Sequence, residues 1–206
     1  MSKLNPLGGF ALLCVACLTI MVGCVIVPGL PSVSTALGVP NAASWLVTLP
    51  SLGVVVFGHL VGLLMKRIGA YKALVIDLVL YGALGLVGMW LFNPIVLFTD
   101  RLLLGGATAM VMASGTNLIS DFYEGDARLR MIATQGVAIE LGGVIFLAIG
   151  DILAGIGWQY PFLLYLAAWV FLAMACSSSR ARSRPRPRHR KKKSRPRQPG
   201  PNPMSA

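Results

Sequence analysis

The sequence predicts an all-α polytopic membrane protein: six transmembrane helices followed by a disordered basic tail. The chain has 206 residues, of which 56% are hydrophobic and 12% are charged, whereas a soluble domain carries about 25% charged residues. Six apolar segments approach the length of about 20 residues that a membrane-spanning helix needs. We place these segments at residues 7–27, 43–65, 73–92, 95–119, 131–153 and 158–176, so a membrane domain covers 1–176 and the tail covers 177–206.

The net charge of +11 arises entirely in the tail, because the basic and acidic residues before it are equal in number. Prolines and repulsion between like charges predict that the tail is disordered. A polybasic segment beside a membrane helix attracts anionic lipid. Nucleic-acid binding is not expected, because the tail has no aromatic residue on which a base could stack.

The loops between the apolar segments predict the orientation of the chain in the membrane. Loop 28–42 and the turns at 93–94 and 154–157 contain no Lys or Arg, whereas the alternate connections contain Lys66, Arg67, Lys72, Arg128 and Arg130. Positive charge stays on the cytoplasmic side of a membrane protein. We therefore expect an integral protein of a bacterial inner (plasma) membrane, with both termini in the cytoplasm.

Four ionisable residues in or beside the spans are candidates for substrate transport or coupling: Arg101, Glu140, Asp100 and Asp151. Charged groups inside a span are costly and usually mark function. Helical rise places Arg101 about 4–5 Å in depth from Asp151 and about 12 Å from Glu140. We expect Arg101 to contact Asp100 or Asp151, which leaves Glu140 as a midplane carboxyl able to exchange a proton. The alternative for Glu140 is a neutral carboxyl that bonds to a neighbouring helix.

Asp77 lies one turn into the third span, at the depth of Lys66 and Arg67. We expect an ion pair that latches these two spans. The Cys14-x-x-Cys17 pair lies in an apolar run without polar neighbours, so it is interpreted as packing. No metal-ligand cluster, nucleophile or phosphate-binding motif is found in the sequence, so neither an enzyme nor a cofactor is expected.

Glycines recur within the spans, as in the Gly58-x-x-x-Gly62 pair. Small residues allow helices in lipid to approach closely. We therefore expect these glycines to mark tight helix packing.

Gly62, Leu64, Arg67, Gly69 and Leu74 match a loop signature, G-x-L-a-D-R-x-G-R-K-x-x-L. In this stretch, residues 62–74, the chain resembles the major facilitator superfamily. Lys66 stands where that signature has an acid. Residues 101–109 are similar to the span 4 signature R-x-x-x-G-x-x-x-A, with Arg101, Gly105 and Ala109 in place.

Three shorter matches accompany these signatures along the same chain. The stretches 126–130 and 157–162 look like the family's entries to spans 5 and 6, and Pro28-Gly-Leu-Pro31 resembles the P-x-L-P of its drug-efflux branch. The antiporter signature of the family has a Gly-Pro pair in span 5. This chain lacks that pair and has Gly142-Gly143 near its position.

The resemblance implies a secondary active transporter, specifically the N-terminal six-span half of a twelve-span unit. It also implies proton-coupled efflux of small molecules, with the substrate bound between two halves. Arg101 and Glu140 would then line the cavity. A lone half needs a partner, which would be a second copy of the chain or a separate C-terminal half.

Two alternatives remain at the level of sequence. The change of composition after Cys176 is typical of a frameshift, so the chain could represent a truncated fragment that does not transport. Alternatively, the membrane domain anchors a polybasic tail that binds anionic lipid or nucleic acid. Translating the gene in its other two frames tests the frameshift, since further apolar spans must then appear.

Overall fold

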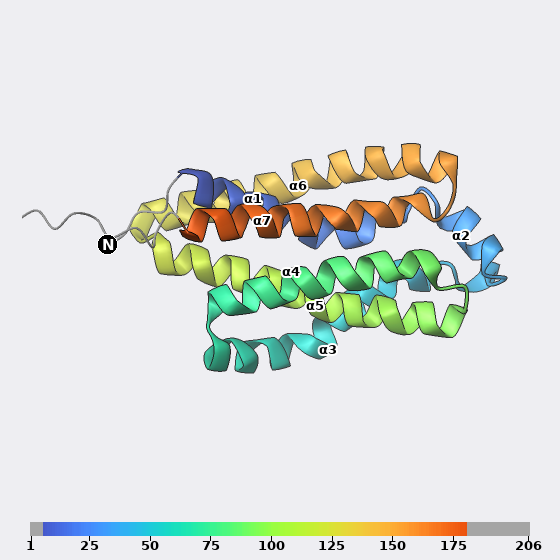
Figure 1. The fold of residues 1–206 in the computed structure, drawn as a ribbon, viewed down its shortest axis with the longest axis horizontal. Coiled ribbons are helices and arrows are strands. Elements are labelled where there is room, and N and C mark those ends of the chain that lie inside the picture. Colours follow the sequence, from blue (N-terminus) through green and yellow to red (C-terminus); the bar gives the residue numbers. More distant parts are fainter. Residues whose placement is uncertain (1–5, 181–206) are drawn as a thin grey trace, which may run out of the picture.

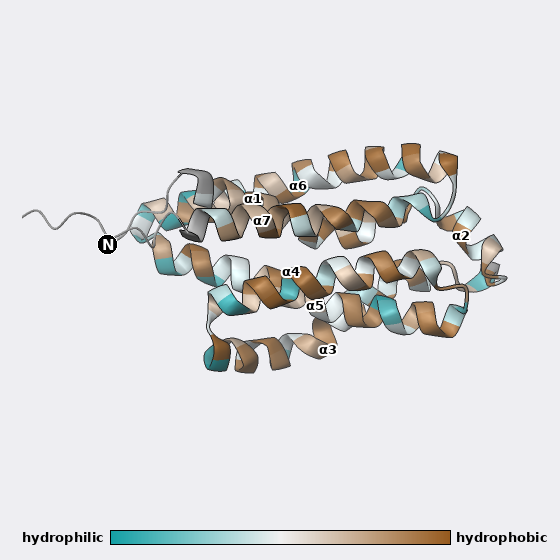
Figure 2. Ribbon diagram, viewed as in Figure 1, coloured by the Kyte–Doolittle hydropathy of each residue, from teal (hydrophilic) through white to brown (hydrophobic). Residues whose placement is uncertain are grey.

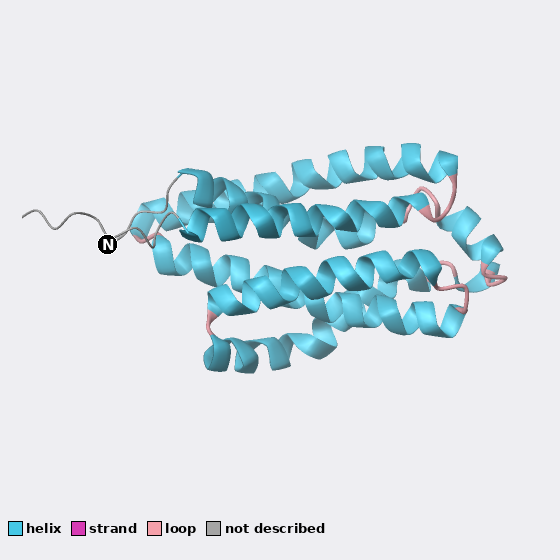
Figure 3. Cartoon of the chain, viewed as in Figure 1, coloured by secondary structure: helices cyan, strands magenta, loops and turns pink. Residues whose placement is uncertain are grey.

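The computed structural model describes residues 6–180, and within that range it contains helices and loops but no strand (Figure 3). The six long helices are α1 (Pro6–Cys24), α3 (Trp45–Ile68), α4 (Ala70–Val87), α5 (Pro94–Phe122), α6 (Gly125–Ile156) and α7 (Ala167–Arg180). The shorter ones are α2 (Leu30–Ala36) and the 3₁₀-helices η1 (Pro40–Ala42), η2 (Gly88–Trp90) and η3 (Tyr160–Leu166). Most of the predicted tail, 181–206, lies outside the described residues.

The predicted fold class is confirmed. Five helical segments are long and apolar enough to cross a membrane, namely Trp45–Ile68, Ala70–Trp90, Pro94–Phe122, Gly125–Ile156 and Tyr160–Ser177, and Gly8–Cys24 is a shorter apolar helix. Figure 2 shows apolar residues along the lengths of these helices. The last span begins as the 3₁₀-helix η3, with Pro161 near its start, and continues as α7.

The long helices run roughly parallel and antiparallel to one another (Figure 1). α5 packs against α3, α4 and α1, and α1 also packs against α6 and α7. In the most apolar stretch of α5, 61% of the residues are buried inside the bundle. The corresponding share is 22% in α3 and 22% in α6. The outer faces of α3 and α6 therefore present apolar side chains to the surroundings, as expected in lipid.

One end of the bundle carries the positive charge of the loops. The described chain starts and stops at this end, where the α3–α4 and α5–α6 connections also lie (left in Figure 1), whereas α2 lies at the opposite end. Lys66 and Arg67 are in the last turn of α3, and Arg128 and Arg130 are in the first turns of α6. We call this the basic end.

α3 and α5 touch backbone to backbone in the half of the bundle that lies away from the basic end. A Cβ atom added to Gly105 would overlap the Pro50 carbonyl oxygen and lie 2.9 Å from Gly53 Cα. Pro50 stands inside α3, and a proline within a helix removes one backbone hydrogen bond and kinks the axis. Gly105, from the span 4 signature, thus fixes the closest approach of the two helices.

Replacing Gly105 with alanine is expected to cost about 1–3 kcal/mol of folding stability, because the new methyl group overpacks this crossing. Gly115→Ala is the matched control on the same helix, since a Cβ at Gly115 would meet no atom within 4 Å. That change should be neutral or stabilising, because alanine favours helix. Unfolding titrations in detergent micelles measure both variants, and equal stabilities would contradict this packing.

Candidate functional site

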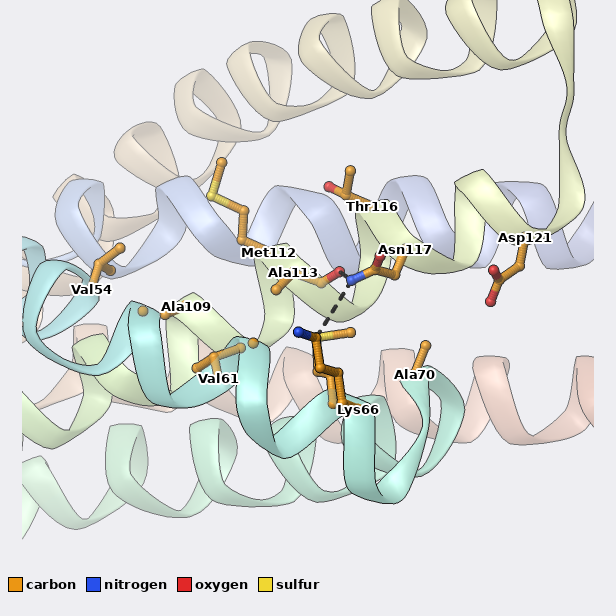
Figure 4. A pocket seen from close by; sticks show the side chains of 13 residues that line it. Val54, Val61, Lys66, Ala70, Ala109, Met112, Ala113, Thr116, Asn117 and Asp121 are labelled. Carbon is orange, nitrogen blue, oxygen red and sulfur yellow. Dashed lines mark hydrogen bonds between the residues drawn. The ribbon is translucent and has the colours of Figure 1, made fainter.

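A cavity of about 720 Å³ opens between α3 and α5 towards the basic end (Figure 4). Its lining combines small apolar residues with four polar side chains, Lys66, Thr116, Asn117 and Asp121. Asn117 Nδ2 donates a hydrogen bond to the Ala113 carbonyl oxygen at 3.0 Å and approaches Met65 Sδ at 3.5 Å. The cavity thus offers one cation, one carboxylate and an amide on otherwise apolar walls, a mixture that is typical of small-molecule sites.

The cavity exists because α3 diverges from α5 beyond the Gly53–Gly105 crossing. Gly58 and Gly62 lie about one and a half and two and a half turns beyond Gly53 on α3, and a Cβ at either position would meet nothing within 4 Å. The expectation that the Gly58–Gly62 pair packs tightly is therefore wrong for this structure. Tight packing does hold for Gly142, where a Cβ would lie 2.7 Å from Cys17 Cβ.

The loop signature lies at the basic end of this cavity. Gly62 and Lys66 line it, whereas the neighbouring Arg67 lines a second hollow on α3. Gly69 ends α3 with φ of 81°, a conformation that side-chain-bearing residues rarely adopt. Gly69 is therefore required to turn the chain directly from α3 into α4. Ala109, from the span 4 signature, lies on the α5 wall of the same cavity.

Arg101 lies in a closed aromatic cluster and has no exposed surface. Its Nη1 donates a hydrogen bond to Tyr165 Oη at 3.2 Å, and its guanidinium carbon lies 5.0 Å from the centre of the Phe162 ring. The Tyr81 ring lies 5.4 Å from that of Tyr165, and Tyr81 Oη donates to the Leu18 carbonyl oxygen at 2.7 Å. The cluster thereby connects α5 with η3, α4 and α1.

Asp100 supplies the negative charge of this cluster. Its Oδ2 atom lies 3.2 Å from Arg101 Nη2, so the expected contact between Arg101 and Asp100 is present. Neighbouring residues on a helix point in different directions, and this pair does not have the geometry of a hydrogen bond, so Asp100 Oδ2, Arg101 Nε and Arg101 Nη2 lack hydrogen-bond partners among the described residues. The ion pair is therefore enclosed by the bundle with part of its hydrogen-bonding capacity unused.

The other two candidates are not brought to Arg101. Asp151 is exposed on α6 near the end opposite the basic end, and Glu140 is exposed at the middle of α6. The alternative Arg101–Asp151 contact is therefore not formed. Arg101 is fully buried within this six-span unit and is not among the residues that line the α3–α5 cavity.

Asp77 is buried on α4 and contacts α5, not the loop cations. Ser114 Oγ donates to Asp77 Oδ2 at 2.7 Å, whereas Asp77 Oδ1 has no hydrogen-bond partner among the described residues. Lys66 and Arg67 are exposed, so the expected latch between Asp77 and these cations is not formed. The reason is orientation: the side chain of Asp77 points into the bundle, whereas the two cations project from the outer turns of α3.

Sequence reasoning did not identify Ser114, Tyr165 or Phe162 as partners. A signal did exist for Ser114, because helical rise places it and Asp77 at similar depths, about 11 Å from the basic ends of their helices. No comparable signal existed for the two aromatic residues, since their contact with Arg101 depends on how the last span packs against α5.

The comparisons with known proteins identify the family of this chain. The family model described as Major Facilitator Superfamily matches residues 11–206, and that range includes every helix from α2 to α7 together with most of α1. A comparison with curated proteins gave no match. The match covers nearly the whole chain and agrees with the all-helical membrane fold and with both signatures. The chain therefore belongs to the Major Facilitator Superfamily of membrane transporters.

Proposed function

We propose that this chain forms one six-span wall of a secondary active transporter that exports small molecules in exchange for protons. In this proposal the basic end faces the cytoplasm, because Lys66, Arg67, Arg128 and Arg130 gather there and positive loops remain cytoplasmic. The cavity between α3 and α5 then opens towards the cytoplasmic side.

The observation that carries this proposal is the exposure of Glu140. It lies at the middle of α6, and its neighbours on the outer face are apolar, such as Val137 at 61% and Val144 at 67% exposure. A charged side chain facing lipid at the centre of a bilayer costs about 2.5–3.5 kcal/mol or more. Glu140 is therefore better accommodated if its face of α6 borders a water-filled path or another protein.

Both conditions are met if a second six-span unit packs opposite this one. Facilitator transporters bind substrate between two such units, and α3 and α6 are the least buried of the long apolar spans here. The second unit is either another copy of this chain or a separate C-terminal half. In either arrangement Glu140 would take up and release the coupling proton at the wall of the shared path.

Reconstituted full-length chain tests this function directly. We expect ethidium, a permanently charged dye, to cross vesicles that contain the chain faster than protein-free vesicles, and only when a pH gradient is imposed. The gradient should collapse faster when ethidium is present, because the two fluxes are exchanged. Ethidium flux equal to that of empty vesicles under every gradient would contradict proton-coupled efflux of this dye by copies of this chain alone.

A further inference from the structure

A second hollow, separate from the α3–α5 cavity, lies where α3, α4 and α5 meet on the outside of the bundle. Its volume is about 830 Å³, and leucines of all three helices line it, including Leu60, Leu63, Leu80, Leu84 and Leu103. Several of these side chains are among the exposed large hydrophobic residues. We call this hollow the leucine groove.

The leucine groove is charged at one end only. Lys66 and Arg67 line it in the last turn of α3, and no acidic residue is among its lining residues. Neither cation forms an ion pair with an acid in the described part of the chain. The acid of the adjoining helix, Asp77, is turned inwards and bonded to Ser114. The two positive charges are therefore available to a ligand.

The length of the groove matches one leaflet of a bilayer. From Arg67 to Phe57, its far residue on α3, helical rise gives about 15 Å, which is half of the roughly 30 Å hydrocarbon thickness of a membrane. The cations thus lie near the depth of lipid headgroups when the leucines lie beside acyl chains. The α3–α5 cavity is different in kind, because its lining includes a carboxylate, that of Asp121.

We propose that the leucine groove is a binding site for one anionic phospholipid. The phosphate-bearing headgroup contacts Lys66 and Arg67, and an acyl chain lies along the leucines. Basic pockets between transmembrane helices bind anionic headgroups in this way, and a guanidinium matches the geometry of a phosphate. A bound lipid would fill the space between the diverging end of α3 and α4. This site does not depend on the proposed transport activity.

Native mass spectrometry of the full-length chain in detergent tests the site. The protein is mixed with equal amounts of dioleoyl phosphatidylglycerol and dioleoyl phosphatidylcholine, and the ratio of retained lipids is measured. We expect preferential retention of phosphatidylglycerol, with a preference about 30-fold lower in Lys66→Gln/Arg67→Gln, because each basic residue contributes about 1 kcal/mol and 1.4 kcal/mol is tenfold.

Arg128→Gln/Arg130→Gln is the matched control, because it removes the same charge from the same end of the bundle without altering the groove. The basic tail is present in every variant, so its contribution cancels. Leu80→Trp, which fills the groove and leaves the charge unchanged, should also reduce lipid retention. Free glycerol 3-phosphate should not displace the lipid, since the acyl chain provides part of the binding.

Four results would overturn the lipid site. Equal losses in the two double variants would show attraction to general surface charge. Equal retention of the two lipids by the wild-type chain would exclude headgroup selection. Displacement by glycerol 3-phosphate alone, or no effect of Leu80→Trp, would show that the anion binds without the groove.

Discussion

Arg101→Ala is expected to lower the free energy of unfolding by about 3–5 kcal/mol, the range seen when one member of a buried ion pair is removed. The change leaves the carboxylate of Asp100, which is 6% exposed, without its countercharge. It also deletes the side chain around which Tyr165 and Phe162 pack. Unfolding of the purified chain in detergent measures the loss.

Two further variants separate charge from packing in this cluster. Arg101→Lys keeps the charge but cannot reach both Asp100 and Tyr165 with a planar fork, so its stability should be intermediate. The double variant Asp100→Asn/Arg101→Met removes both charges and should be more stable than Arg101→Ala, because no uncompensated charge remains. A double variant as unstable as Arg101→Ala would contradict this account of the ion pair.

Glu140→Gln is expected to abolish ethidium transport driven by a pH gradient, because the amide has nearly the shape of the carboxyl but cannot take up a proton. Folding should be little affected, since the side chain of Glu140 is exposed and changes at exposed positions usually alter stability by less than about 0.5 kcal/mol. The pH dependence of exchange should disappear in the same variant.

Asp126→Asn is the matched control for this prediction. Asp126 is an exposed acid in the first turn of the same helix, outside the apolar part of the span. We expect its replacement to leave exchange and its pH dependence unchanged. Wild-type rates in Glu140→Gln would show that another group carries the proton, and equal losses in both variants would indicate a general effect of charge on α6.

The membrane fold was predictable from the sequence because it depends on lengths of apolar chain. The apolar run 95–119, for example, predicted a membrane-spanning helix. The observed helix α5 is only slightly longer, from Pro94 to Phe122. The helix ends were predicted less well where polar residues continue a helix into water. α6 begins at Gly125, not at residue 131, because the polar turn from Asp126 to Arg130 is itself helical.

The contacts of the candidate site residues could be predicted only in part. The sequence indicates the depth of each residue along the membrane normal, and residues at different depths cannot touch. Depth reasoning anticipated the contact of Arg101 with Asp100, but it could not choose between that contact and one with Asp151. Rotation of each helix about its axis decides such choices. Rotation turned Asp77 towards Ser114 and away from Lys66.

The glycine patterns in the sequence indicated which positions could allow two helices to pack closely. They did not indicate at which of these positions the helices actually meet. Gly105 does bring two backbones together, whereas Gly62 lines an open cavity. The difference arises from the divergence of α3 beyond Pro50, and a GxxxG spacing does not encode that divergence. The cavity could therefore be recognised only in three dimensions.

The water accessibility of position 140 tests most directly whether the exposed face of α6 borders a transport path. Glu140→Cys would be made in a chain whose Cys14, Cys17, Cys24 and Cys176 are replaced by alanine, reconstituted in vesicles and treated with a charged maleimide. Val79→Cys, on the outer face of α4, is the lipid-facing reference. We predict labelling at position 140 and none at position 79. Equal protection of the two positions would contradict the proposal that Glu140 faces a water-filled path between two six-span units.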